Sequence, residues 1–398
     1  NAYKEFDNPK IVTFQELEKN FWIMQLFHGP TLAFKDYALQ ILGGLFNHVL
    51  SKEDKRVVVV GATSGDTGSA AIEAFKGYDN ISIIIFHPKG RVSEVQRRQM
   101  TTVVAHNVYN VAINGTFDDC QALVKAMFND LHFRDELRLA AINSINWARI
   151  LSQVIYYGYS SLQLGNSDKR INFSVPTGNF GNVYSGYVAS VLGFPIGKLY
   201  VTTNANDILT RVFSGKGYYK NDVIPTISPS MDIQVASNFE RLLFELYGYD
   251  GDVIKSLFQS LDSNNGFTIG REQLNLVLQK FSAMSINDDR ALECINGVWK
   301  KYGILIDPHT AVGIQGAEDI LKQEDKSFGT IPIACLATAH PAKFPEAVHR
   351  ATGIKPALPE RLSDLLQRKE NINYLENDLY VVKKFVREVG LKNNRDIQ

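Results

Sequence analysis

Lys35 is the residue of this sequence whose setting most directly suggests chemistry. It follows three apolar residues, Leu32–Phe34, in the run HGPTLAFKD, and apolar residues recur at helical spacing after it. A lysine amine held out of water gives up its proton more readily and can attack a carbonyl carbon, such as that of a carbonyl cofactor. The common alternative is a lysine whose stem lies on an apolar surface while its charge stays in water. Residue types alone leave both interpretations open.

A segment rich in glycine and hydroxyl side chains follows the apolar run Val57–Val60. It reads GATSGDTG and contains Thr63, Ser64, Gly65, Asp66 and Thr67. Backbone N–H groups and the positive end of a helix dipole at such a turn suit a carboxylate or a phosphate. No lysine follows the last glycine, so the segment is not a nucleotide P-loop. The alternative is a tight turn into a helix, with hydroxyl caps.

Two further loops also follow apolar runs. The loop PTGNFGN, residues 176–182, comes after Ile171–Val175, and its closely spaced glycines would let the backbone approach an anion. Thr338 follows Ile331–Leu336, where its hydroxyl would face the sheet edge at which ligands bind. The alternatives are a capped turn and a simple helix cap. Two anion-binding loops together suggest a ligand that carries a phosphate and a second acidic group.

The elements that must position these loops alternate between short apolar runs and amphipathic segments. The expected strands cover residues 57–60, 81–86, 108–113, 171–175, 199–203 and 331–336, and the expected helices cover 69–76, 93–104, 117–129 and 183–192. This alternation predicts an α/β protein with parallel sheets and more than one doubly wound unit. We also expect a loop over 215–230, helical structure over 252–301 and a helical cap over 359–398.

Composition narrows the class of protein. A chain of 398 residues exceeds one small core and predicts two domains. Lys plus Arg and Asp plus Glu both total 42, so net charge favours neither nucleic acid nor a membrane surface as a partner. No apolar run approaches the roughly 18–20 residues that span a bilayer. Cys120, Cys294 and Cys335 are far apart, which favours a reducing compartment, here the cytoplasm. The scattered histidines predict no metal site.

Seven motifs occur here in the order in which the threonine synthase family has them. They are LFHGPTLAFKD, GATSGDTGSAA, NSINWARI, VPTGNFGN, TNANDIL, DPHTAVG and TAHPAKF, from Leu26 to about Glu346. The chain thus resembles the threonine synthases, which are fold-type II enzymes that depend on pyridoxal 5′-phosphate (PLP). The family carries several tens of residues before the lysine motif, so we expect a native N-terminal segment to be missing.

The resemblance implies a fold and a division into domains. It implies the α/β fold of a fold-type II PLP-dependent enzyme, with two doubly wound parallel-sheet domains and the active site between them. We expect residues 1–50 and 147–398 to form a larger, discontinuous domain that binds the PLP phosphate. Residues 51–146 would form a smaller domain that carries the substrate-carboxylate loop.

The resemblance also implies roles for individual residues. Lys35 resembles the lysine that holds PLP as a Schiff base and serves as the catalytic base. The expected contacts to the PLP phosphate come from Gly178, Asn179, Phe180, Gly181 and Asn182, and Thr338 is expected to meet the pyridine nitrogen. The expected substrate contacts come from Thr63, Ser64, Gly65, Asp66, Thr67, Ser144, Asn146 and Arg149, with Ser144 and Arg149 at the substrate phosphate. His309 is expected near the site without an assigned role.

The implied activity is that of a PLP-dependent carbon–oxygen lyase in threonine biosynthesis. It would convert O-phospho-L-homoserine and water into L-threonine and phosphate by γ-elimination and β-addition, as a monomer or homodimer. The enzymatic alternative is a related phospho-lyase that releases 2-oxobutyrate from the same substrate. A non-catalytic PLP-binding protein would be favoured if Lys35, Asn179 or Thr338 were replaced, and none is. A nucleotide-binding protein would need a P-loop lysine or a GxGxxG after a strand.

Overall fold

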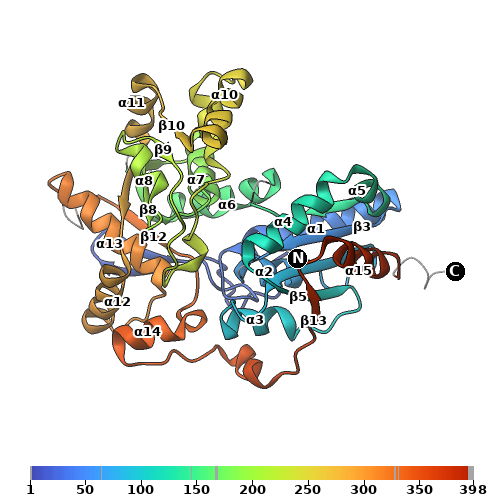
Figure 1. Cartoon of the computed structure of the whole chain (residues 1–398). Coiled ribbons are helices and arrows are strands. Elements are labelled where there is room, and N and C mark those ends of the chain that lie inside the picture. Colours follow the sequence, from blue (N-terminus) through green and yellow to red (C-terminus); the bar gives the residue numbers. More distant parts are fainter. Residues whose placement is uncertain are drawn as a thin grey trace. The chain divides into compact units, whose positions relative to one another are not determined.

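The computed structural model describes residues 2–63, 65–144, 146–165, 169–326, 329 and 331–392. The chain divides into two compact units (Figure 1). Unit 1 comprises residues 1–7, 29–146 and 357–398, and unit 2 comprises residues 8–28 and 147–356. Of the helices in the described ranges, none combines the length and the apolar character that a membrane span requires.

A six-stranded sheet forms the centre of unit 2. Its strand order is β1-β2-β12-β7-β8-β11, and every neighbouring pair is parallel except β1 and β2. The strands are β1 (Thr13–Glu18), β2 (Phe21–Gln25), β7 (Ile171–Pro176), β8 (Ile196–Thr203), β11 (Phe281–Ser285) and β12 (Ile333–Ala337). The strands β7 and β12 are buried along their whole length, as expected for strands covered on both faces.

Helices cover this sheet, and the unit also contains a separate two-stranded sheet. The longer helices are α6 (Trp147–Leu164), α7 (Gly181–Val191), α10 (Gly251–Ser263), α11 (Arg271–Lys280), α12 (Asp288–Tyr302) and α13 (Pro308–Gln323). The shorter elements are α8 (Ile208–Phe213), α9 (Phe239–Leu246), α14 (Pro345–Thr352), the 3-10 helices η1 (Pro229–Met231) and η2 (Pro341–Lys343), and the paired strands β9 (Tyr218–Tyr219) and β10 (Gly266–Phe267). The buried side chains of α12 and α13 share one apolar core with β2 and β12.

Unit 1 is built on a five-stranded, entirely parallel sheet with the order β13-β5-β4-β3-β6. The strands are β3 (Val57–Ala62), β4 (Ile81–Pro88), β5 (Val108–Asn114), β6 (Leu139–Ala141) and β13 (Asn373–Glu376). The helices are α1 (Lys35–Glu53), α2 (Asp66–Phe75), α3 (Glu94–Thr101), α4 (Phe117–Asn129), α5 (Leu131–Leu137) and α15 (Leu379–Lys392), with the 3-10 helices η3 (Glu360–Leu362) and η4 (Leu365–Gln367). One core joins β3, β4 and β5 to α4, α5 and α15.

The apolar runs predict the central strands well. Each of the six expected strands and four expected helices is present, with ends shifted by up to three residues. The expectation of continuous helical structure over 252–301 is wrong in part, because β10 and β11 interrupt it. The expected helical cap near the C-terminus also includes β13, which pairs with β5. The antiparallel pair β1 and β2 was not anticipated.

The compact units divide the chain differently from the expected domains. The boundary at Asn146 and Trp147 coincides with the expected one, but residues 29–50 and 357–398 belong to unit 1 rather than to the larger domain. The reason is packing within unit 1. Helix α1 packs on α2, and β13 and α15 complete the sheet and core that β3, β4 and β5 begin.

Candidate active site

Two of the expected substrate segments leave the unit 1 sheet side by side. Strands β3 and β6 are parallel neighbours, with Val60 opposite Ala141, so the chain leaves both at the same edge. After β3 come Thr63 and the start of α2, and after β6 come Ser144 and Asn146. Ser64 lies outside the described residues. This edge is where ligands bind in open α/β sheets.

The hydroxyl of Thr63 caps helix α2 from two residues upstream. The N-cap residue Gly65 has no side chain to accept a hydrogen bond and takes φ +143°, which favours glycine. Thr63 Oγ1 instead accepts from the amide of Gly65 at 3.0 Å and from that of Gly68 at 2.9 Å. Thr63 therefore holds the loop in place and occupies two amides that an anionic ligand could otherwise bind.

Lys35 is the first residue of α1, and its amine faces the first residue of α2. Lys35 Nζ lies 3.6 Å from Asp66 Oδ2, and the two side chains are 13% and 4% exposed. The other oxygen of Asp66, Oδ1, accepts a hydrogen bond of 2.8 Å from Gln96 Nε2. The structure thus joins the expected Schiff-base lysine to a residue of the expected substrate loop.

The turn that leads into Lys35 is held by Asp36. The buried Asp36 carboxylate accepts hydrogen bonds from the amide and the hydroxyl of Thr31, both at 2.8 Å. Gly29 lies so close to Asp36 that a Cβ atom there would overlap the carboxylate. Two side chains fix the outer side of the turn, with Gln99 donating to the Thr31 carbonyl at 3.1 Å and Arg361 donating to the Gly29 carbonyl at 2.6 Å. The position of Lys35 is therefore set by packing and hydrogen bonds on both sides of the turn.

The expected phosphate loop and Thr338 share an edge of the unit 2 sheet. Strands β7 and β12 are parallel neighbours, with Cys335 opposite Ser174. The loop 177–182 follows β7, and Thr338, which is 6% exposed, follows β12. The topology therefore brings together the two segments that sequence reasoning assigned to the phosphate and to the pyridine nitrogen.

The loop expected to bind phosphate is anchored by the ring of Phe180. This residue takes the left-handed φ of +66° at the start of α7, a conformation that costs a non-glycine residue about 1 kcal/mol or more. Its fully buried ring packs against Phe239 and Phe281, with centroids 5.4 and 5.9 Å away. Burial of one aromatic side chain offsets that cost. On the other side, the amide of Asn238 donates to the Asn179 carbonyl at 3.0 Å.

A polar network after β8 holds the segment that supports this loop. Gly178 packs directly on Met231, where an added Cβ would lie 3.1 Å from Cα. Next to Met231, Asp232 accepts hydrogen bonds from Asn204 at 2.8 Å and Asn206 at 3.1 Å. Burial raises the pKa of Asp232, against the lowering effect of its hydrogen bonds from Thr226 and Asn204.

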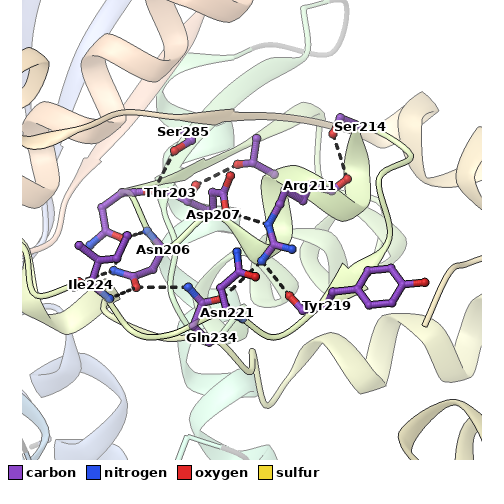
Figure 2. A network of polar contacts seen from close by, with 12 residues as sticks. Thr203, Asn206, Asp207, Arg211, Ser214, Tyr219, Asn221, Ile224, Gln234 and Ser285 are labelled. Atoms are coloured by element: carbon purple, nitrogen blue, oxygen red, sulfur yellow. Dashed lines mark hydrogen bonds and ion pairs between the residues drawn. The ribbon is translucent and has the colours of Figure 1, made fainter. Parts of the chain in front are cut away.

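Figure 2 shows the continuation of this network. The Arg211 guanidinium donates to the Asp207 carboxylate at 2.8 Å and to the Tyr219 carbonyl at 2.8 Å. Asn206 binds both backbone groups of Ile224, donating to its carbonyl at 2.8 Å and accepting from its amide at 2.9 Å. The segment TNANDIL, which begins at the last residue of β8, thus holds the loop 214–234 in place through hydrogen bonds.

Arg149 is buried in the first turn of α6. It is 4% exposed, and burial lowers the pKa of its guanidinium to about 10. A guanidinium so depleted of water binds an anion strongly, because it has little hydration left to lose. The structure places Arg149 in unit 2, whereas Ser144 and Asn146 of the same motif lie in unit 1.

Asp307 and His309 form a buried pair at the start of α13. Asp307 Oδ2 lies 2.6 Å from His309 Nδ1, and the two side chains are 0% and 4% exposed. Asp307 also caps the helix by accepting from the amides of His309 at 3.0 Å and Thr310 at 3.1 Å. A pocket in unit 2 is lined by Asp307 and Thr310 together with Ala337 and Ala339, the neighbours of Thr338. His309 therefore lies near the strand end that carries Thr338.

Comparison with known proteins defines the class first. The family model described as "Pyridoxal-phosphate dependent enzyme" matches residues 9–257, more than half of the chain. A second model, described as "Threonine synthase, C-terminal", matches residues 310–386. The chain is 48% identical to a threonine synthase from Pseudomonas aeruginosa, over 98% of this chain and 82% of that protein. The chain therefore belongs to the threonine synthase family of fold-type II PLP-dependent enzymes.

Solved structures agree with this assignment. A PLP-bound threonine synthase from Brucella melitensis superimposes with a TM-score of 0.93 at 49% identity, covering 98% of this chain and 82% of that one. The yeast threonine synthase gives a TM-score of 0.91 at 39% identity, with 98% and 83% covered.

The residues of unit 2 fit a cofactor that carries a phosphate. The amide nitrogen Nδ2 of Asn182, in the first turn of α7, is buried and has no hydrogen-bond partner among the described residues. An unused donor at a helix N-terminus is suited to a phosphate oxygen.

Several residues that hold this site were missed from the sequence. Hydrogen bonds to expected site residues come from Gln96, Asn238, Tyr156 and Tyr157, whereas Asp36 acts through Thr31 in the turn that leads into Lys35. Only Asp36 stands beside a recognisable motif residue. The others are distant in sequence, so spacing gave no signal for them.

Proposed function

We propose that this protein is a threonine synthase that converts O-phospho-L-homoserine and water into L-threonine and phosphate. The observation that carries the proposal is similarity at 48% identity along nearly the whole chain to a protein named threonine synthase. The chain also has a largely buried lysine, Lys35, whose amine lies 3.6 Å from the carboxylate of Asp66.

We propose that Lys35 and the loop Gly178–Asn182 hold the cofactor, with Thr338 at the pyridine nitrogen. Lys35 Nζ would hold the aldehyde group, and the loop would hold the phosphate at the N-terminus of α7. Bound PLP supplies an electron sink for negative charge that develops on the substrate carbons. A neutral hydroxyl at Thr338, unlike a carboxylate, does not stabilise a proton on the pyridine nitrogen.

Lys35 also moves protons in this proposal. When the substrate amine has replaced it, Lys35 Nζ is free to accept the proton from Cα and then one from Cβ. Phosphate would leave from Cγ, where a proton passed on from Lys35 would complete the methyl group. Water would then add its oxygen at Cβ and give up a proton to the released phosphate, and Lys35 would return a proton to Cα. The negative charge of Asp66 at 3.6 Å stabilises the protonated amine between these transfers.

The remaining assignments concern the substrate. We assign the α-carboxylate to the loop Thr63–Thr67, through those amides at the start of α2 that the Thr63 hydroxyl does not occupy. We assign the substrate phosphate to Arg149 with Ser144 and Asn146. Asp66 itself is a carboxylate and would repel another one, so its contribution within the loop is directed at Lys35. Arg149 is buried and has lost most of its hydration, which supports the proposal that its guanidinium binds an anion.

The first experiment tests the lysine. Purified protein reconstituted with PLP should show the visible absorption band of a Schiff base, and borohydride should remove it and attach the cofactor to a peptide that contains Lys35. Lys35→Ala should lose both results, whereas Lys52→Ala, an exposed lysine in the last turn of the same helix, should retain them. A label on another lysine, or none, would contradict the proposal.

The second experiment tests the product. O-phospho-L-homoserine is supplied to the reconstituted protein, and phosphate, threonine and 2-oxobutyrate are measured together. Threonine should appear in proportion to phosphate. If 2-oxobutyrate appears in its place, the related phospho-lyase activity is the correct one. We further propose that the protein is a cytoplasmic monomer or homodimer. The cytoplasmic location is supported by the three cysteines, Cys120, Cys294 and Cys335, which are free and buried.

A further inference from the structure

The side-chain amide of Asn182 is held from one side by two tyrosines of α6. Asn182 Oδ1 lies 2.6 Å from the Tyr156 hydroxyl and 2.9 Å from the Tyr157 hydroxyl. Asn182 is 7% exposed, and Tyr156 and Tyr157 are 2% and 0% exposed. On the other side of the amide, Nδ2 has no partner among the described residues.

The tyrosine hydroxyls determine which way the amide faces. A buried hydroxyl needs an acceptor for its proton, and the acceptor that Tyr157 has among the described residues is Asn182 Oδ1. Burial raises the pKa of Tyr157 far above its ordinary value, so the hydroxyl keeps its proton and remains a donor. If the amide were turned over, its N–H groups would face the hydroxyls and the Tyr157 proton would lose its acceptor. The oxygen therefore faces the tyrosines, and the NH₂ group faces away from them.

The donor presented in this way lies in the first turn of α7. That turn follows the loop Gly178–Phe180, and the helix dipole makes its N-terminus favourable for an anion. A buried amide donor without an acceptor is unfavourable, so its retention at this place indicates that a ligand supplies the acceptor.

We infer that Tyr156 and Tyr157 are positioning residues, which hold the Asn182 carboxamide so that Nδ2 donates a hydrogen bond to the phosphate group of the cofactor. The inference rests on the proposed function, since it requires PLP at this loop. Tyr156 and Tyr157, which are not among the expected site residues, thereby gain a specific task.

Tyr157 offers the cleaner variant of the two. The Tyr156 hydroxyl has a second acceptor nearby, Gln153 Oε1 at 3.1 Å, so its proton is not committed to Asn182. The Tyr157 ring packs edge-on against Phe173, with centroids 5.0 Å apart, and next to the Tyr156 ring at 5.0 Å. Tyr157→Phe therefore removes the hydroxyl while the ring keeps its contacts.

The experiment compares two ligands that differ only in the phosphate. Apoprotein is titrated with PLP and with pyridoxal, and the ratio of their dissociation constants measures the contribution of the phosphate. Asn182→Leu should reduce this ratio about 10- to 100-fold, the range of one hydrogen bond to a charged group. Tyr157→Phe should reduce it several-fold, because the amide can then turn over.

Asn182→Asp tests whether the group that faces away from the tyrosines must be a hydrogen-bond donor. The aspartate can still accept from both tyrosines, but it places a negative oxygen where Nδ2 was. We expect a larger loss of the PLP preference than in Asn182→Leu, with pyridoxal affinity within about twofold of the original protein. The matched control is Tyr187→Phe, which removes a hydroxyl of α7 that donates to Glu245 at 3.0 Å. That variant should leave both affinities unchanged.

The outcomes separate this inference from the proposed function. If the original protein does not prefer PLP over pyridoxal, the cofactor site itself is wrong. If it does, but Tyr157→Phe and Asn182→Asp keep the full preference, the positioning role is refuted and the proposed function stands. If either variant weakens PLP and pyridoxal equally, the tyrosines serve the general fold of the loop and the inference is also refuted.

Discussion

Replacement of Thr63 by valine tests whether one hydroxyl holds the substrate loop. Valine has the shape of threonine but cannot accept the hydrogen bonds from the amides of Gly65 and Gly68. Each buried amide left without an acceptor costs about 1–3 kcal/mol, so the local structure should lose at least about 2 kcal/mol. Thr63→Ser is the matched control, since it keeps the hydroxyl and loses one methyl group, worth about 1 kcal/mol.

The appropriate assay is local, because a chain with two compact units need not unfold in one step. Hydrogen exchange measured by mass spectrometry on peptides from residues 61–76 reports the opening of the loop and of α2. A loss of 2 kcal/mol corresponds to roughly thirtyfold faster exchange, since about 1.4 kcal/mol is a factor of ten. If Thr63→Val exchanges within twofold of Thr63→Ser, the hydroxyl does not carry the loop and the reasoning is wrong.

Three further predictions concern packing, capping and pH. Gly43→Ala would overlap a backbone oxygen of α2 and should cost about 1–3 kcal/mol or more in a thermal-unfolding assay, whereas Gly44→Ala, which has open space, should stabilise α1 by about 0.5–1 kcal/mol. Asp307→Ala should lower stability by at least the 1–2 kcal/mol of a helix cap, with Asp307→Asn in between; equal melting temperatures would show that the cap is dispensable. Burial lowers the pKa of His87 below 6.5, so as the pH falls the unfolded chain binds this proton before the folded protein does. The stability linked to His87 is therefore complete above about pH 6.5 and declines below it. The melting temperature of His87→Gln should fall less than that of the original protein between about pH 7.5 and pH 5.5, and an equal fall would refute the assignment.

The fold could be predicted where burial leaves a strong pattern. Val57–Val60 is apolar on every residue and Ile171–Val175 on three of its five, because their strands are largely buried on both faces, and this signal does not depend on distant contacts. Strands β11 and β13 gave no such signal. Each pairs with only one neighbour and is partly exposed, so its strand conformation comes from the pairing with β8 or β5 rather than from its own sequence.

The candidate site could likewise be predicted from the sequence where a local pattern marks it, and not where it depends on packing between helices. The loops at the ends of β3, β7 and β12 could be found because each comes directly after a buried strand. The ion pair between Lys35 and Asp66 could not, since it depends on how α1 packs against α2. The link from Tyr157 to Asn182 likewise depends on the packing of α6 on α7.

The assembly of unit 1 from three chain segments has a consequence during synthesis. Strand β3, which leads into the proposed substrate loop, is made early, but β13 and α15 come after all of unit 2 has been made. Val382, Val386 and Val389 of α15 are part of the same core as β3, β4 and β5. Until they leave the ribosome, the nascent sheet has an open edge at β5 and an uncovered apolar surface. This interval is the one in which chaperones would protect the protein from aggregation, and a chain that ends near residue 356 could complete the core of unit 2 but not that of unit 1.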